Sequence, residues 1–226
     1  MNKRWLSLVI VALVVVAGLG VVVGRQTAPS TTSTSTSTTT PPTTQPVEAL
    51  WPIASTPTRF ADPTTAAFSF AHDYLGMTQP LLGTFQRGDS RSGELALRAS
   101  AAGPVTTVMV RQVTADNTWW VIGAASSAIV VSAPRALASI SSPVMLTGRS
   151  TAFEAVVNVE VRQDASLVPI VRTTVMGGGA GVMGPFAKSV IFAHPTSHYG
   201  AIIFRTLSAK DGSVVEASVV RIAFGA

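Results

Sequence analysis

The sequence predicts a mainly β protein, in which an antiparallel β-sandwich follows a small α+β unit and one N-terminal transmembrane helix. Three observations predict this class: one long apolar run near the start, a Thr/Ser/Pro-rich stretch after it, and short β-forming segments separated by turn residues. We therefore expect a membrane anchor at residues 1–25, a disordered linker at 26–59, an α+β domain at 60–133 and the sandwich at 134–226.

The apolar run covers residues 5–24, contains no charge and has 16 apolar side chains among its 20 positions. A helix of this length spans about 30 Å, the thickness of a bilayer core, whereas the apolar region of a cleaved signal is shorter. Lys3 and Arg4 outweigh Arg25, so the positive-inside rule predicts a cytoplasmic N-terminus and extracytoplasmic C-terminal domains. The alternative is a cleaved signal, because Gly24 ends a Val-Val-Gly sequence that is compatible with cleavage.

The linker composition predicts disorder. Residues 26–47 contain 14 Ser or Thr and four Pro among 22 positions, and Val47 is their first large apolar side chain. Such a segment cannot bury enough surface to offset the entropy of ordering. A bare flexible tether and an O-glycosylated stalk both fit this composition.

The charge balance and the cysteine count exclude several classes of function. The chain has 16 Lys+Arg and 11 Asp+Glu, but three basic residues flank the apolar run, so residues 26–226 hold 13 basic and 11 acidic groups. A net charge of only +2 argues against a nucleic-acid-binding face. The absence of cysteine excludes disulfides, zinc–cysteine sites and cysteine catalysis. We expect neither a nucleic-acid partner nor a cofactor.

The α+β domain is predicted to open with a helix. Asp62 is a suitable N-cap and Pro63 suits the first helical position, while Gly76 is a natural stop. Apolar residues at a spacing of three or four lie between these signals, at Ala67, Phe68, Ala71, Tyr74 and Leu75.

Three strands are expected after the helix, at residues 94–100, 105–113 and 118–124. Trp119 and Trp120 in the last strand point to opposite faces, which predicts one core ring and one ring at the surface or at a domain junction. An exposed ring there is a candidate platform for carbohydrate, and simple packing is the alternative.

The C-terminal part predicts about seven short strands, the pattern of an antiparallel sandwich. They are expected at residues 128–131, 144–147, 155–162, 168–175, 188–192, 201–208 and 214–222. Val157, Val159 and Val161 alternate with polar residues, as in a half-buried strand.

Four short sequences in this part carry a family resemblance. Residues 140–155 read Ile-Ser-Ser-Pro-Val-Met-Leu-Thr-Gly-Arg-Ser-Thr-Ala-Phe-Glu-Ala, Pro-Phe and Val-Ile-Phe follow at 185–186 and 190–192, and residues 208–213 read Ser-Ala-Lys-Asp-Gly-Ser. Together they resemble the bacterial spore-germination immunoglobulin-like domain family over about residues 138–224. The resemblance implies an immunoglobulin-like fold in an exported protein, and it carries over no catalytic residue.

Two motifs suggest ligand chemistry, and their context argues against it. Gly179–Gly184 matches the dinucleotide-binding glycine pattern, but Pro185 and a strand follow where that motif requires a helix, so we expect a hairpin loop. His194 and His198 have a spacing that suits a metal on a helix, but Pro195 predicts a loop there. No metal ligand is therefore predicted.

Three residue pairs are interpreted as structural. His72 and Asp73 are neighbours on the predicted helix, so their side chains should diverge rather than form a catalytic pair. Phe153 is expected to fill the end of the sandwich, with Glu154 accepting backbone hydrogen bonds. The Asp211-Gly212 sequence predicts a hairpin turn between the last two strands.

These observations predict a non-catalytic, membrane-anchored extracytoplasmic protein with a monomeric ectodomain. Its immunoglobulin-like module is expected to bind an envelope protein or cell-wall glycan, with no catalytic, cofactor-binding or metal-binding residues. Two alternatives stay open: an enzyme that processes envelope polymers at a cleft between the two domains, and a purely architectural spacer.

Overall fold

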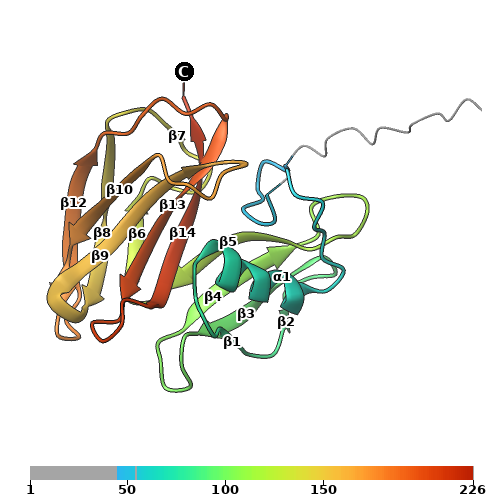
Figure 1. The fold of residues 1–226 in the computed structure, drawn as a ribbon, viewed down its shortest axis with the longest axis horizontal. Coiled ribbons are helices and arrows are strands. Elements are labelled where there is room, and N and C mark those ends of the chain that lie inside the picture. Colours follow the sequence, from blue (N-terminus) through green and yellow to red (C-terminus); the bar gives the residue numbers. More distant parts are fainter. Residues whose placement is uncertain (1–44, 54, 226) are drawn as a thin grey trace, which may run out of the picture. The chain divides into compact units, whose positions relative to one another are not determined.

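The computed structural model describes residues 45–53 and 55–225 (Figure 1). The predicted anchor and residues 26–44 of the predicted linker lie outside this part of the chain. Within the described ranges, no helix is both long enough and apolar enough to cross a membrane.

The helix begins where the sequence predicts. The Asp62 carboxylate accepts a hydrogen bond from the Thr65 backbone N–H at 2.9 Å, capping α1 (Pro63–Ser69). The chain continues through a π-helical turn, Phe70–Tyr74, and leaves the helix near Gly76, whose φ is +82°.

A small antiparallel sheet packs against this helix. Its strands are β1 (Leu81–Leu82), β2 (Gln86–Arg87), β3 (Ser92–Arg98), β4 (Thr106–Arg111) and β5 (Trp120–Ser126). β3, β4 and β5 correspond to the three predicted strands. Their buried side chains and those of α1 form one apolar core.

Part of the predicted linker belongs to this core. Leu50 and Trp51 lie within the predicted linker, yet both are buried in this core. Trp51 forms a β-bridge with Val121, and its indole N–H donates to the Ser69 hydroxyl at 3.0 Å. The prediction of disorder is therefore wrong for Leu50 and Trp51, because this short apolar sequence adds to the edge of β5.

The remaining strands form the predicted antiparallel sandwich, and the chain is mainly β. They are β6 (Ile129–Ala133), β7 (Ser139–Ile140), β8 (Val144–Ala152), β9 (Val156–Gln163), β10 (Val171–Met176), β11 (Gly178–Gly179), β12 (Gly184–Val190), β13 (Tyr199–Leu207) and β14 (Val214–Phe224).

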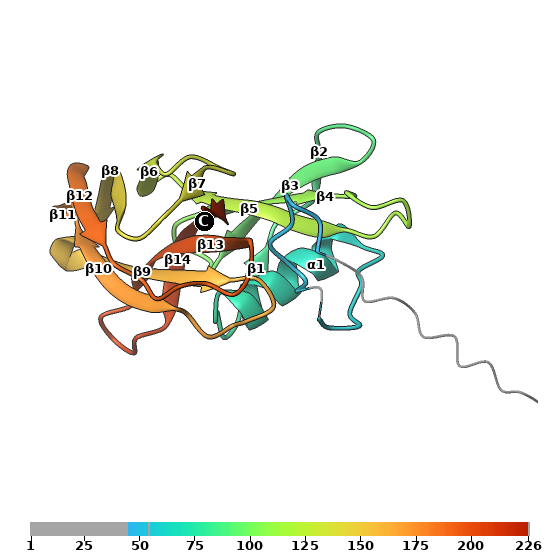
Figure 2. The ribbon, with the colours of Figure 1, turned by 90° about the horizontal axis from the view of Figure 1, so that it is seen from above.

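The sandwich has two layers. One layer has the strand order β10–β9–β13–β14, and the other has the order β12–β8–β6 (Figure 2). Val157, Val159 and Val161 face the core between the layers, which confirms the alternation in β9. At the side where β10 and β12 approach each other, the Lys188 ammonium donates to the Thr174 carbonyl at 2.8 Å.

The sandwich begins ahead of the boundary predicted after residue 133. β6 pairs with β8 over most of its length, and Ile129 is buried in the sandwich core. Residues 129–133 complete a layer of the sandwich, because β8 would otherwise lack a partner along that edge.

The β10–β9–β13–β14 layer is covered on both faces along β13 and β14. Ile202 and Phe204 point into the sandwich core, whereas Ala201 and Ile203 belong to the core that contains α1. A strand buried on both faces reads as an apolar run rather than as an alternation, which explains the sequence of β13. β14 also pairs with β5. The two predicted domains thus share a sheet and a core.

Replacing Gly212 by Val is expected to destabilise the protein by about 1–2 kcal/mol, because a β-branched residue is strained in the left-handed region. Gly212 has φ +72° in the predicted turn between β13 and β14, and its N–H donates to the Ser208 carbonyl. Urea denaturation measures the change. Gly212→Asn is the matched control, since Asn tolerates this conformation and should cost less; equal losses would contradict the explanation.

Candidate functional site

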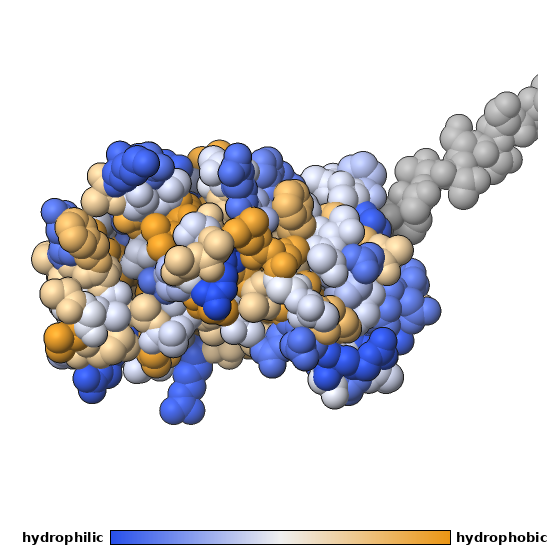
Figure 3. Space-filling view, turned by 90° about the horizontal axis from the view of Figure 1, so that it is seen from below, coloured by the Kyte–Doolittle hydropathy of each residue, from blue (hydrophilic) through white to orange (hydrophobic). Residues whose placement is uncertain are grey.

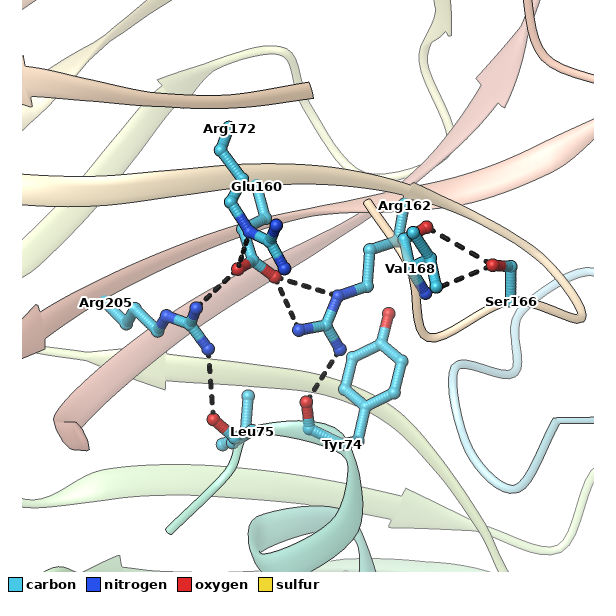
Figure 4. Close-up of polar contacts among 8 residues, drawn as sticks. All are labelled: Tyr74, Leu75, Glu160, Arg162, Ser166, Val168, Arg172 and Arg205. Atoms are coloured by element: carbon cyan, nitrogen blue, oxygen red, sulfur yellow. Dashed lines mark hydrogen bonds and ion pairs between the residues drawn. The ribbon is translucent and has the colours of Figure 1, made fainter. Parts of the chain in front are cut away.

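The most extensive polar cluster surrounds Glu160, on the outer face of β9, and we call it the Glu160 cluster (Figure 4). The Glu160 side chain is only 3% exposed, yet its carboxylate contacts three guanidinium groups. Arg162 lies two residues along the same strand, Arg172 is directly opposite on β10, and Arg205 comes from β13. Strand alternation places all four side chains on one face of the sheet.

The arginines share the two carboxylate oxygens. Arg162 donates from Nε to Oε2 at 2.9 Å, Arg172 donates from Nε to Oε1 at 3.1 Å, and Arg205 also donates to Oε1. Burial raises the pKa of Glu160, but the hydrogen bonds and charges of Arg162 and Arg205 outweigh burial, so the pKa is lower than its ordinary value.

The same arginines hold the end of the helix. Arg162 donates to the Tyr74 carbonyl at 2.7 Å, and Arg205 donates to the Leu75 carbonyl at 3.2 Å. The Arg162 guanidinium also lies 4.9 Å from the centre of the Tyr74 ring, and burial raises the pKa of Tyr74 to about 12. Carbonyls at a helix C-terminus have no partner within the helix, so the cluster satisfies them and fixes the helix to the sandwich.

A second buried ion pair fixes the start of the described chain. Arg221 of β14 pairs with Asp164, and its Nε donates to the Val47 carbonyl at 2.8 Å. Both polar groupings therefore join the N-terminal part to the same sandwich layer.

One side of the Glu160 cluster reaches the surface. Arg172 is 70% exposed, and the cluster holds three guanidinium groups against one carboxylate. Excess positive charge is therefore present at the edge of the sheet.

Other outward-facing residues of these strands continue the exposed surface toward one end of the sandwich. We call the surface the rim face; it consists of Arg172, Thr174 and Met176 on β10, Asn158 and Val156 on β9, and Arg205 and Leu207 on β13. Met176 is 64% exposed and Leu207 is 36% exposed. Seen from below in Figure 3, the surface of the molecule mixes hydrophobic and hydrophilic residues.

Two adjoining hollows lie near the opposite end of the sandwich. Their volumes are about 380 and 330 Å³, and His194, Pro195, Phe224 and Gly225 line both. His194 and His198 lie in the loop between β12 and β13, as predicted. Among residues 45–53 and 55–225, no group of three or more His, Cys, Asp or Glu side chains is placed to hold a metal ion.

The prediction for His72 and Asp73 is wrong, because the two side chains meet. His72 Nδ1 lies 2.7 Å from Asp73 Oδ1, and the other oxygen of Asp73 accepts a hydrogen bond from Ser69 at 2.7 Å. The bond to Ser69, one turn earlier, and the bond to His72 lower the pKa of Asp73. Both side chains are about half exposed on the helix surface.

One tryptophan was predicted to lie at the surface or at a domain junction, and of these two positions the surface is wrong. Trp119 is 8% exposed and packs edge-on against Phe85, and Trp120 is fully buried. The Trp120 ring lies 5.0 Å below the guanidinium of Arg59, and its indole N–H donates to the Thr118 hydroxyl at 3.1 Å. A nearby segment thus covers the second face of the strand, so neither ring offers a carbohydrate platform.

Phe153 does not fill the end of the sandwich. It is 74% exposed in the short 3₁₀ turn Phe153–Ala155, where Glu154 and Ala155 both have φ +61°. These two positive φ values turn the chain away from the core, so Phe153 points outward. Truncating Phe153 to Ala would therefore leave no internal cavity.

The two remaining motifs form turns. The glycine pattern Gly179–Gly184 forms a turn from β11 to β12, with positive φ at Ala180 and Gly181. The prediction of a loop followed by a strand is confirmed, but the loop is not a hairpin, because β11 and β12 each pair with β8. Asp211 accepts hydrogen bonds from both the backbone N–H and the hydroxyl of Ser213, which lower its pKa. The interpretation of Asp211-Gly212 as a hairpin turn is confirmed.

The sequence analysis did not single out the Glu160 cluster. A signal was present in β9, where Glu160 and Arg162 interrupt a strand whose other residues are mostly apolar. Two charges of opposite sign on one face of a buried strand indicate an internal ion pair. The positions of Arg172 and Arg205 carry no comparable local signal.

The strands and their two apolar cores define a two-layer antiparallel sandwich joined to a small α+β part. Residues 128–213 match the family described as the immunoglobulin-like domain of bacterial spore germination, which confirms the resemblance. This match indicates an immunoglobulin-like module of the kind that binds other molecules. Searches of curated proteins and of solved structures gave no match.

Proposed function

We propose that this chain is a non-catalytic, membrane-anchored extracytoplasmic protein whose immunoglobulin-like module binds another component of the bacterial envelope. The observation that carries the proposal is the match of residues 128–213 to an immunoglobulin-like domain family. The uncharged apolar run at residues 5–24, with Lys3 and Arg4 before it, supports the anchor and its orientation. The Thr/Ser/Pro-rich segment that follows would hold the module away from the bilayer.

Protease treatment of intact, wall-stripped cells tests the orientation. We expect added protease to remove the folded part, because residues 26–226 are proposed to face outward. An antibody against a C-terminal tag follows the loss, and a cytoplasmic protein of the same cells is the control for lysis. Full protection of the tag, or its release into the medium without protease, would contradict the anchored orientation.

A further inference from the structure

We propose that the rim face binds an extended, acidic segment of a partner protein, with a carboxylate on Arg172 and an apolar side chain on Met176. This inference rests on the proposed function and names the chemistry of the partner. It follows from the charge, the apolar surface and the spacing of the rim face.

The charge of the Glu160 cluster favours an anionic group. Glu160 is the one carboxylate that contacts Arg162, Arg172 and Arg205 among the described residues. Arg172 uses Nε to reach Glu160, and its side chain is 70% exposed, so its terminal nitrogens face solvent. A guanidinium can donate two parallel hydrogen bonds to one carboxylate. The terminal nitrogens of Arg172 can therefore bind a second carboxylate while Nε stays bonded to Glu160.

The apolar end of the rim face favours a protein. Met176 and Leu207 are exposed. Val156 is on β9, the strand between β10 and β13 in the same layer. Methionine and arginine are enriched at protein–protein interfaces, and methionine adapts to partner side chains of different shapes. The rim face has no aromatic ring on which a sugar could stack, so we assign a protein segment rather than a glycan.

The spacing defines the length of the segment. Arg172, Thr174 and Met176 alternate along one face of β10, so the guanidinium and the thioether arise four residues apart. At about 3.3 Å per residue this separation is about 13 Å. An extended peptide with an acidic and an apolar residue four positions apart matches it.

Fluorescence anisotropy with a short peptide tests the inference. The probe is a fluorescein-labelled pentapeptide of sequence glutamate-threonine-serine-threonine-leucine, added to the full chain in mild detergent. We expect saturable binding that weakens with salt and falls on the order of fivefold in Arg172→Gln or Met176→Ser. Arg149→Gln and Met145→Ser are the matched controls, because both residues are exposed on β8 of the other layer; they should change binding less than twofold.

Several results would overturn the inference. These are the absence of peptide binding at millimolar concentration, and equal losses in the rim-face and control variants. Binding of polygalacturonate in an Arg172-dependent manner, without binding of the peptide, would assign the rim face to an acidic glycan. Thermal melts of each variant separate lost binding from lost folding.

Site-specific photo-crosslinking in cells separates this inference from the proposed function. A photoreactive residue at position 174 should capture a protein with an acidic segment, whereas the same residue at position 145 should not. Capture from position 145 alone would refute the rim face and leave a binding module in place. Capture from neither position would count against both proposals.

Discussion

Replacing Glu160 by Gln is expected to lower the free energy of unfolding by about 3–5 kcal/mol, because the substitution leaves buried guanidinium groups without a counter-charge. Arg162 and Arg205 are largely buried and depend on this carboxylate. Urea denaturation measures the loss. Arg172→Gln is the control, since an exposed partner contributes at most about 1 kcal/mol. Equal effects of the two substitutions would mean that the buried charges are stabilised in another way.

The same variant should alter the pH dependence of stability. The folded-state pKa of Glu160 lies below its ordinary value, so its contribution is fully present above the unfolded-state pKa of about 4.3. That contribution is lost as the pH falls through the lower, folded-state pKa. We expect wild-type stability to decline below about pH 4.5 and to decline less steeply in Glu160→Gln. Parallel curves for the two proteins would contradict a role for this carboxylate.

A fragment of residues 134–226 is expected not to fold cooperatively. It lacks β6, and it exposes Ile203 and Val219, which pack in the core that contains α1. Burying Ile129, Ile203 and Val219 contributes about 1.5–3 kcal/mol each, a large part of the 5–15 kcal/mol that stabilises a typical domain. The fragment also separates Arg162 and Arg205 from the helix carbonyls that they cap.

Circular dichroism and one-dimensional NMR of three fragments test this expectation. Residues 45–226 should melt in one transition, because the described chain forms one compact unit. Residues 128–226 restore β6 and should gain structure without reaching the same melting temperature. A cooperative melt of residues 134–226 close to that of residues 45–226 would show that the sandwich does not need the shared core.

Local signals predicted local structure well. Asp62 and Pro63 predicted the start of the helix, the alternating valines predicted β9, and Asp211-Gly212 predicted the turn between β13 and β14. Each of these structures depends mainly on interactions among residues that are close in the sequence. The mainly β class followed from the number and spacing of such segments.

What could not be predicted depends on contacts between distant residues. One face of β13 packs in the sandwich core, and the other face packs in the core that contains α1 and Leu50. Both α1 and Leu50 lie far from β13 in the sequence. Trp119 is buried in the same core as α1, whereas Trp120 is covered by Arg59, which also lies far from it in the sequence. The prediction for Phe153 was wrong for a different reason. The positive φ values of Glu154 and Ala155 have no signal in the sequence.

The hydrogen bond from Lys188 to the Thr174 carbonyl has a consequence for the behaviour of concentrated solutions. β10 is the outermost strand of its layer, and the unpaired edge of such a strand is a template on which a second molecule can add a strand. Lys188 reaches that strand from β12 of the other layer and opposes such growth, because burying its ammonium under an incoming strand is costly. Removing the side chain, as in Lys188→Val, would therefore raise the tendency of the protein to aggregate through edge-to-edge strand pairing.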